Sequence, residues 1–296
     1  MENRRNEKAS SLRWKILRKA LLRHRSPSNQ DENSEMGIKQ ISRKITHGFN
    51  LIPSHIVNDD ECDSNKCDVF VCYTLPIPCA LQLFLKQRVD NHADLSDFEI
   101  CNRYNIDNTG LVCNWPSEDV LAHYCISHSD MFRSKKVVEL GSGYGLAGFV
   151  IAAVTEASEV VISDGNPQRN IETNRGAFGD TIVKSMMLHW NQEEVLNVAG
   201  NFDIIVATLS SRISTDALLV LSKRSSEAIF LSPKRGDSLD MFLEVVQENG
   251  LHFSVTENYD TEVWKRHEGF LNGEDKDSWP SYEKGHCYPL LIKITL

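Results

Sequence analysis

The chain has 296 residues, a formal net charge of −9 and a composition ordinary for a globular protein. This length indicates one large domain or a domain with an extension. The charge is uneven, because residues 1–25 carry nine Lys or Arg and two Glu, which leaves −16 on the remainder. The acidic body lacks the clustered Lys and Arg that phosphate contacts need, so we expect no nucleic-acid partner.

Eight cysteines are present without a CxxC pair, so we do not expect a structural zinc site. The sequence shows no secretory signal pattern and no apolar run near about 20 residues. We therefore expect reduced thiols, no membrane partner, and a protein of the cytoplasm and nucleus.

The N-terminal third gives weaker signals. Residues 1–25 are basic, and within them residues 9–25 predict an amphipathic helix with aliphatic side chains on one face. This helix suits wrapping by calmodulin, packing on its own domain, or nuclear import or a membrane surface. Residues 26–37 predict a flexible linker. Residues 38–105 give an ambiguous pattern, and we expect a β-rich region in which Pro76 and Pro78 favour the edge of a sheet or the end of a strand.

Residues 106–296 show regular alternation of strands and helices, which predicts an α/β fold with a Rossmann-like, doubly wound, seven-stranded sheet. Strands are expected at 136–140, 159–164, 181–190, 202–207, 227–233, 252–259 and 287–296. Helices are expected at 116–132, after the turn within 141–155, and at 166–177, 214–226 and 237–250. We expect little helix between the last two strands, which favours an antiparallel end of the sheet.

A Gly-rich turn follows the first of these strands in VVELGSGYGLAG. Gly141, Gly143 and Gly145 allow a tight turn and let a ligand approach bare backbone. The spacing is GxGxG, whereas phosphate-binding dinucleotide sites have GxGxxG. Glu139 adds negative charge beside the turn, so the pattern suits a ligand with a cationic amino group, such as S-adenosylmethionine. A merely structural turn is the alternative.

Three further residues belong to the predicted cofactor site. Asp164 closes the next strand, 23 positions after Gly141, where a carboxylate accepts hydrogen bonds from ribose hydroxyls. Trp190 follows the third strand, where its indole either walls the adenine or packs in the core of the sheet. Trp115 precedes a helix at the mouth of the site, and it either flanks the ligand or fixes that helix.

Taken together, NTGLVCNWPSEDVLAHYC, VVELGSGYGLAG, ISDGN and LHW resemble the class I seven-stranded lysine methyltransferases that modify non-histone proteins. The resemblance extends to RWKILRKALL near the start and CYPLLIKITL at the end. It implies transfer of methyl groups from S-adenosylmethionine to one lysine of calmodulin, up to the trimethyl state, by a monomer. It implies a cofactor site made of Trp115, Glu139, Gly141, Gly143, Gly145, Asp164, Trp190 and Ala207. No residue identifies itself as the catalytic base, and no metal is expected.

One segment departs from the pattern of this family, which places an acidic residue directly after the fourth strand. Here the residues are Thr208, Leu209, Ser210 and Ser211. Because both flanks match, an exchanged internal block over 208–226 explains the departure better than gradual drift. Two alternatives follow: an active enzyme, or a variant that binds cofactor and calmodulin without efficient transfer. A nucleotide-linked oxidoreductase is disfavoured by the GxGxG spacing.

Overall fold

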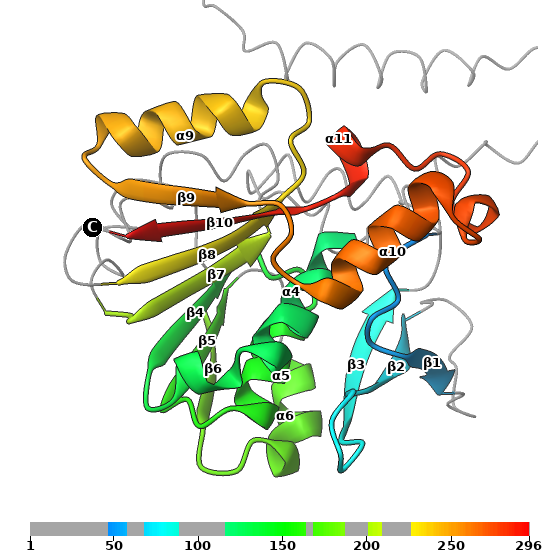
Figure 1. The fold of residues 1–296 in the computed structure, drawn as a ribbon. Coiled ribbons are helices and arrows are strands. Elements are labelled where there is room, and N and C mark those ends of the chain that lie inside the picture. The colour runs from blue at the N-terminus through cyan, green and yellow to red at the C-terminus, as the bar shows by residue number, and fades with distance from the viewer. Residues whose placement is uncertain are drawn as a thin grey trace, which may run out of the picture. The chain divides into compact units, whose positions relative to one another are not determined.

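The structure is a computed structural model, and it describes residues 47–57, 68–88, 116–163, 168–186, 201–208 and 226–295 (Figure 1). The chain divides between residues 39 and 40, and all described residues belong to the second unit, 40–296. The predicted N-terminal helix, the linker and nearly all of the expected helix at 214–226 lie outside the described residues. In the part that is described, no helix is long and apolar enough to cross a membrane.

A seven-stranded sheet in the order β6-β5-β4-β7-β8-β10-β9 forms the centre of this unit (Figure 1). The strands from β6 to β8 run parallel, whereas β10 is antiparallel to both of its neighbours. This confirms the expected fold class and the antiparallel end. The strands are β4 Lys136–Leu140, β5 Glu159–Ser163, β6 Ile182–Met186, β7 Ile204–Thr208, β8 Glu227–Ser232, β9 His252–Thr256 and β10 Leu290–Thr295.

Both faces of the central strands are apolar because helices cover both faces, as is usual for parallel sheets. On one face, Val137 and Val206 belong to the core that includes α4, α5 and α6. On the other face, Val138 and Ala207 belong to a second core with α9. The helices are α4 Pro116–Ser127, α5 Leu146–Val154, α6 Gln168–Asn174 and α9 Ser238–Glu248, with short 3-10 helices at η1 Ser129–Phe132 and η2 Arg175–Ala177.

A second, three-stranded antiparallel sheet is formed by β1 Ser54–Val57, β2 Asp68–Thr74 and β3 Gln82–Arg88. Its central strand β2 ends before Pro76, as the missing N–H of proline predicts. Two asparagines of α6 bind β3 along its length. Phe84 donates its N–H to Asn174 and Lys86 donates its N–H to Asn170, each at 2.8 Å.

The expectation of little helix between the last two strands is wrong. The segment contains α10 Thr261–Asn272, η3 Lys276–Ser278 and α11 Lys284–Cys287. Asp260 caps α10, because its side chain accepts the N–H groups of Glu262 and Val263. The aspartate at position 260 is a residue type typical of a helix start, but the helix that follows has few apolar residues to indicate it.

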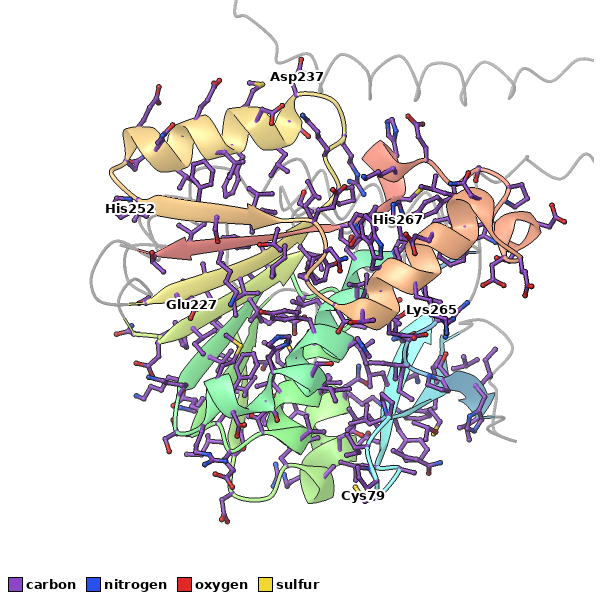
Figure 2. The ribbon with its side chains drawn as sticks, in the orientation of Figure 1. Cys79, Glu227, Asp237, His252, Lys265 and His267 are labelled. Carbon is purple, nitrogen blue, oxygen red and sulfur yellow. The ribbon has the colours of Figure 1, made fainter. Side chains whose placement is uncertain are left out.

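The buried side of α10 is lined by Val263, His267 and Phe270, which follow the helical repeat. His267 is 1% exposed, whereas Lys265 is exposed, and Figure 2 labels both on this helix. Because one of the three inward positions is a histidine, the apolar period is too weak to predict the helix.

Aromatic rings join α10 to the segment that leads into β1. The centroid of the Phe49 ring lies 5.6 Å from that of Phe270 and 6.1 Å from that of Trp279, and both pairs are edge-to-face. Such edge-to-face pairs stabilise beyond the area that they bury. Tyr282 completes the cluster, because its ring centroid lies 5.0 Å from that of Trp279 and 5.1 Å from that of Phe270. The segment before β1 is therefore held by residues more than 200 positions later.

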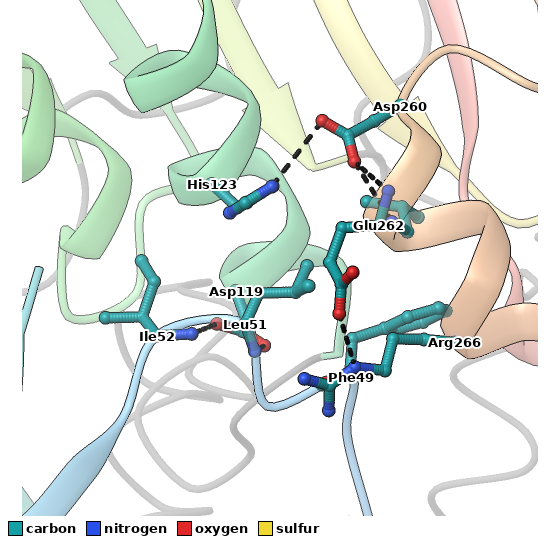
Figure 3. A network of polar contacts seen from close by, with 9 residues as sticks. Phe49, Leu51, Ile52, Asp119, His123, Asp260, Glu262 and Arg266 are labelled. Atoms are coloured by element: carbon teal, nitrogen blue, oxygen red, sulfur yellow. Dashed lines mark hydrogen bonds and ion pairs between the residues drawn. The ribbon is translucent and has the colours of Figure 1, made fainter. Parts of the chain in front are cut away.

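Polar contacts connect the same elements to α4 (Figure 3). The carboxylate of Asp119 accepts the N–H groups of Leu51 at 2.9 Å and Ile52 at 3.1 Å. Burial raises the pKa of Asp119, although these two donors act in the opposite direction. His123 of α4 lies 3.5 Å from the carboxylate of Asp260 at the start of α10. The helix α4 is thus fixed from two sides.

We predict that Asp119→Ala lowers the free energy of unfolding by about 2 kcal/mol, because two buried N–H groups lose their acceptor. Asp130→Ala is the matched control, since Asp130 is exposed and pairs only at the surface with Arg133. The control should change stability by less than about 0.5 kcal/mol. Urea titration measures both values, and equal midpoints for the two variants would contradict the role of Asp119.

Candidate active site

The Gly-rich turn lies between β4 and α5, at the carboxyl edge of the large sheet. β4 pairs in parallel with β5 on one side and β7 on the other, so all three strands end at this edge. The chain order of the strands also reverses at β4. Ligands of open α/β sheets bind at such a switch point. The expected strand, turn and helix are therefore in the position where a cofactor site is built.

The three predicted glycines all adopt the left-handed backbone region. The φ angles are 64° at Gly141, 56° at Gly143 and 82° at Gly145. Side chains make this region costly, and glycine occupies it without penalty. The turn therefore requires glycine at each alternate position and presents bare backbone between the strand and the helix.

Close packing explains why α5 begins immediately after this turn. A Cβ atom on Gly145 would lie 2.9 Å from Cγ2 of Ile162, and one on Gly148 would lie 2.8 Å from its Cγ1. Both distances are too short for carbon atoms in contact. The two glycines thus let the start of α5 press against the end of β5.

Glu139 is 3% exposed and comes two positions before the start of the turn. Its Oε2 accepts the N–H of Gly148, the third residue of α5, at 2.8 Å. A buried carboxylate needs such donors, and the positive end of a helix dipole also favours its charge. The predicted acidic strand end is present, and it binds the helix that follows.

Glu118 is a residue of this region that the sequence did not identify as part of the site. It lies in the first turn of α4, is 8% exposed, and its Oε1 is 3.4 Å from the N–H of Leu146. Burial, and then the neighbouring charge of Asp119, raises the pKa of Glu118 to about 7, although the Leu146 N–H acts against the shift. A glutamate in the first turn of a helix is common, so no sequence signal marked this role.

Two serines tie the turn to the next strand. Ser142 donates both its N–H, at 3.1 Å, and its hydroxyl to the carbonyl oxygen of Ser163. Ser163 ends β5 and is 0% exposed, and its own hydroxyl has no hydrogen-bond partner among the residues that the structure describes. The turn is therefore fixed at the residue that precedes the predicted ribose-binding position, Asp164.

The remaining predicted site residues are distributed as follows. Ala207 is fully buried in β7, where it pairs with Leu140 of β4 and Phe230 of β8. Its methyl group belongs to the core on the α9 side of the sheet. Trp115, Asp164 and Trp190 lie outside the described residues.

The chemistry of the turn fits an adenosyl cofactor with a cationic amino acid part. The backbone is bare at three positions, and two carboxylates occupy the N–H groups of Leu146 and Gly148. A pyrophosphate needs these N–H groups and would meet like charge, whereas an ammonium group would meet opposite charge. Within the described ranges, no cluster of His, Cys, Asp and Glu could hold a metal ion.

A glycine turn of this kind, at the switch point of a seven-stranded sheet with an antiparallel strand next to one edge, defines the class of S-adenosylmethionine-dependent methyltransferases. The model of the lysine methyltransferase family matches residues 99–248. The calmodulin-lysine N-methyltransferase of Arabidopsis thaliana is 56% identical over 97% of this chain and 97% of that protein. The chain belongs to the lysine methyltransferase family, and S-adenosylmethionine is its methyl donor.

Two solved structures resemble the chain more distantly. The precorrin-6y C5,15-methyltransferase of Geobacter metallireducens is 13% identical, with a TM-score of 0.40 over 60% of this chain and 89% of that chain. The branched-chain polyamine synthase of Thermus thermophilus is 15% identical, with a TM-score of 0.41 over 61% of this chain and 56% of that chain.

We predict that Gly148→Ala lowers the free energy of unfolding by about 2 kcal/mol, as overpacking typically does. The added methyl group would lie 2.6 Å from the Glu139 carboxylate and 2.8 Å from Ile162. Gly176→Ala is the matched control, because nothing lies within 4 Å of its added Cβ. Denaturant unfolding compares the two variants, and equal loss of stability would show that the packing of α5 on β5 is not tight.

We predict that ionisation of Glu118 costs stability. Its pKa is about 7 in the folded protein and near 4.5 when unfolded. The folded state therefore binds this proton more tightly, so stability falls as the pH rises from about 5 to about 7 and then levels off. The loss is roughly 3 kcal/mol, from about 1.4 kcal/mol for each pKa unit. Glu118→Gln should remove this component, as thermal unfolding of both proteins between pH 5 and 8 would show. Parallel stability curves would contradict the assignment.

Proposed function

We propose that this chain transfers methyl groups from S-adenosylmethionine to a lysine side chain of calmodulin and reaches the trimethyl state. The observation that carries the proposal is the 56% identity with the Arabidopsis calmodulin-lysine N-methyltransferase across 97% of both chains. Similarity of that extent includes the segments outside the cofactor-binding core, where a methyltransferase recognises its protein substrate. A monomer acting in the cytoplasm and nucleus stays a prediction.

The cofactor would be held by the residues predicted from the sequence. The backbone of the glycine turn would hold the methionine part, and the charge of Glu139 would favour its ammonium group. Asp164 would accept hydrogen bonds from the ribose, and Trp115 and Trp190 would flank the ring system. Ala207 would contribute its backbone at the end of β7.

S-adenosylmethionine supplies a methyl group on a positively charged sulfur, which is already a good electrophile. The protein therefore has two tasks, which are to align the lysine amine with the methyl group and to let the amine lose its proton. A free lysine has a pKa near 10.4, so most of it is protonated at neutral pH. Either water takes this proton, or the site lowers the pKa of the lysine amine.

Thr208 favours the second candidate function, a chain that binds cofactor and calmodulin but transfers slowly. Alternation along β7 places its side chain on the same face of the sheet as Glu139, opposite that of Ala207. An acid at this end of the strand would attract the ammonium of the target lysine, and a hydroxyl cannot do so as strongly. The residues that follow, 209–225, lie outside the described part of the chain.

We predict that the purified full chain incorporates labelled methyl groups into unmethylated calmodulin, and that calmodulin trimethylated beforehand takes up none. S-adenosylhomocysteine should inhibit the transfer, because it occupies the same turn. Mass spectrometry of the product gives the number of methyl groups and the lysine that carries them.

If no methyl transfer is detected, calorimetry in the same buffer distinguishes the possible reasons. Binding of S-adenosylhomocysteine and calmodulin without label would support the second candidate. In that case Thr208→Asp should raise the transfer rate at least several-fold, since it restores an acid beside the site. Absence of cofactor binding would overturn the cofactor site itself.

A further inference from the structure

Two buried carboxylates from different elements bind the first turn of α5. Glu118 of α4 contacts the N–H of the first residue, Leu146, and Glu139 of β4 contacts the N–H of the third, Gly148. Both side chains are less than 10% exposed. The turn of residues 141–145 leads directly into these N–H groups, so the two carboxylates fix the point at which the turn ends.

We propose that Glu118 is a positioning residue of the cofactor site: it holds the start of α5, and with it the 141–145 turn, and its negative charge favours the cationic methionine part of S-adenosylmethionine. The inference rests on the proposed function, because it assumes that this turn receives the cofactor. It adds a residue of α4 to a site that the sequence assigned to the glycine turn, strand ends and tryptophans.

Geometry alone would not require an acid at this position. A glutamine has the same length and its amide oxygen accepts the same N–H of Leu146, without the cost of a buried charge. Glu118 carries the charge into a nearly closed environment, where it acts over a longer range than in water. A cation bound at the turn would recover part of that cost, and this is the physical reason to assign a role to the charge.

The titratable groups around Glu118 come from three elements. Asp119 is its neighbour on α4, Tyr73 of β2 lies close enough for the charge of Glu118 to raise its pKa, and Glu139 of β4 binds the same first turn of α5. Tyr144, within the turn itself, also acts on Tyr73. Glu118→Gln leaves all four in place, so their titration is common to the wild type and the variant.

The test compares two ligands by calorimetry on the full chain at pH 7.5. S-adenosylhomocysteine carries the amino acid part, whereas 5′-methylthioadenosine lacks it and keeps the nucleoside. Glu118→Gln should weaken binding of S-adenosylhomocysteine about tenfold, the size expected for one charge-assisted contact, and should change binding of 5′-methylthioadenosine less than about twofold. Glu248→Gln makes the same charge change on the exposed side of α9 and should alter neither affinity.

The pH dependence of the two affinities gives a second readout, which would not change if Glu118 had a purely structural role. Between pH 7.5 and 5.5 the wild type should lose affinity for S-adenosylhomocysteine relative to 5′-methylthioadenosine, because Glu118 takes up a proton. The ratio should stay nearly constant in Glu118→Gln. The wild-type measurement stands even if the variant folds poorly, and Glu118→Asp, which restores the charge, should recover part of the affinity.

Three results have distinct meanings. If the wild type binds neither ligand, the proposed function is wrong. If the wild type binds S-adenosylhomocysteine but Glu118→Gln binds it equally well, with the same pH dependence, the inference is overturned and the proposed function stands. Equal weakening of both ligands in a folded variant would also overturn the inference, since it would indicate a general disturbance of the nucleoside site.

Discussion

The start of α5 is the point on which the rest of the site depends. Its first turn receives carboxylates from β4 and α4, packs on β5 through Gly145 and Gly148, and continues directly from the glycine turn. Each contact involves a group that is buried. A displacement of α5 would break the hydrogen bond between the Gly148 N–H and the buried carboxylate of Glu139, and it would open the close packing of both glycines on Ile162. The geometry of the turn is therefore determined by the packing of this one helix.

The position of Glu118 depends in turn on elements distant in the sequence. Glu118 and Asp119 are adjacent in the first turn of α4, but they serve different neighbours, since Glu118 binds α5 and Asp119 binds the segment before β1. One turn further on, His123 approaches Asp260 at the start of α10. The aromatic cluster around Phe49 then connects α10 back to the same segment. The helix α4 is thus in contact with α5, with the segment before β1 and with α10. The position of the cofactor turn depends on all three contacts.

The sequence predicted those features that arise from local patterns. The parallel strands are buried on both faces and are therefore apolar runs, as in Glu159–Ser163, and the conformation of the turn demands glycine at 141, 143 and 145. The contact between Glu118 and α5 spans 28 positions, and no spacing rule connects the two. The helix α10 was not predicted for a related reason. His267 interrupts the apolar repeat on its buried side, and the histidine can be buried there because its ring nitrogen lies 2.6 Å from the hydroxyl of Tyr282, a contact that the sequence does not reveal.

The buried charge at the turn meets two opposite requirements, which are the stability of the fold and the binding of a cationic ligand. Stability would favour a neutral acceptor at position 118, since burial raises the pKa of the carboxylate to about 7 and its ionised form is costly. A site for a cationic ligand favours the opposite, because two carboxylates next to bare backbone discriminate against phosphate and in favour of ammonium. Functional sites are where such local costs are expected to occur. By the same reasoning the hydroxyl of Thr208 has no such cost. This contrast places the specialised chemistry of the described site at the cofactor turn between β4 and α5, where the carboxylates of β4 and α4 meet the helix.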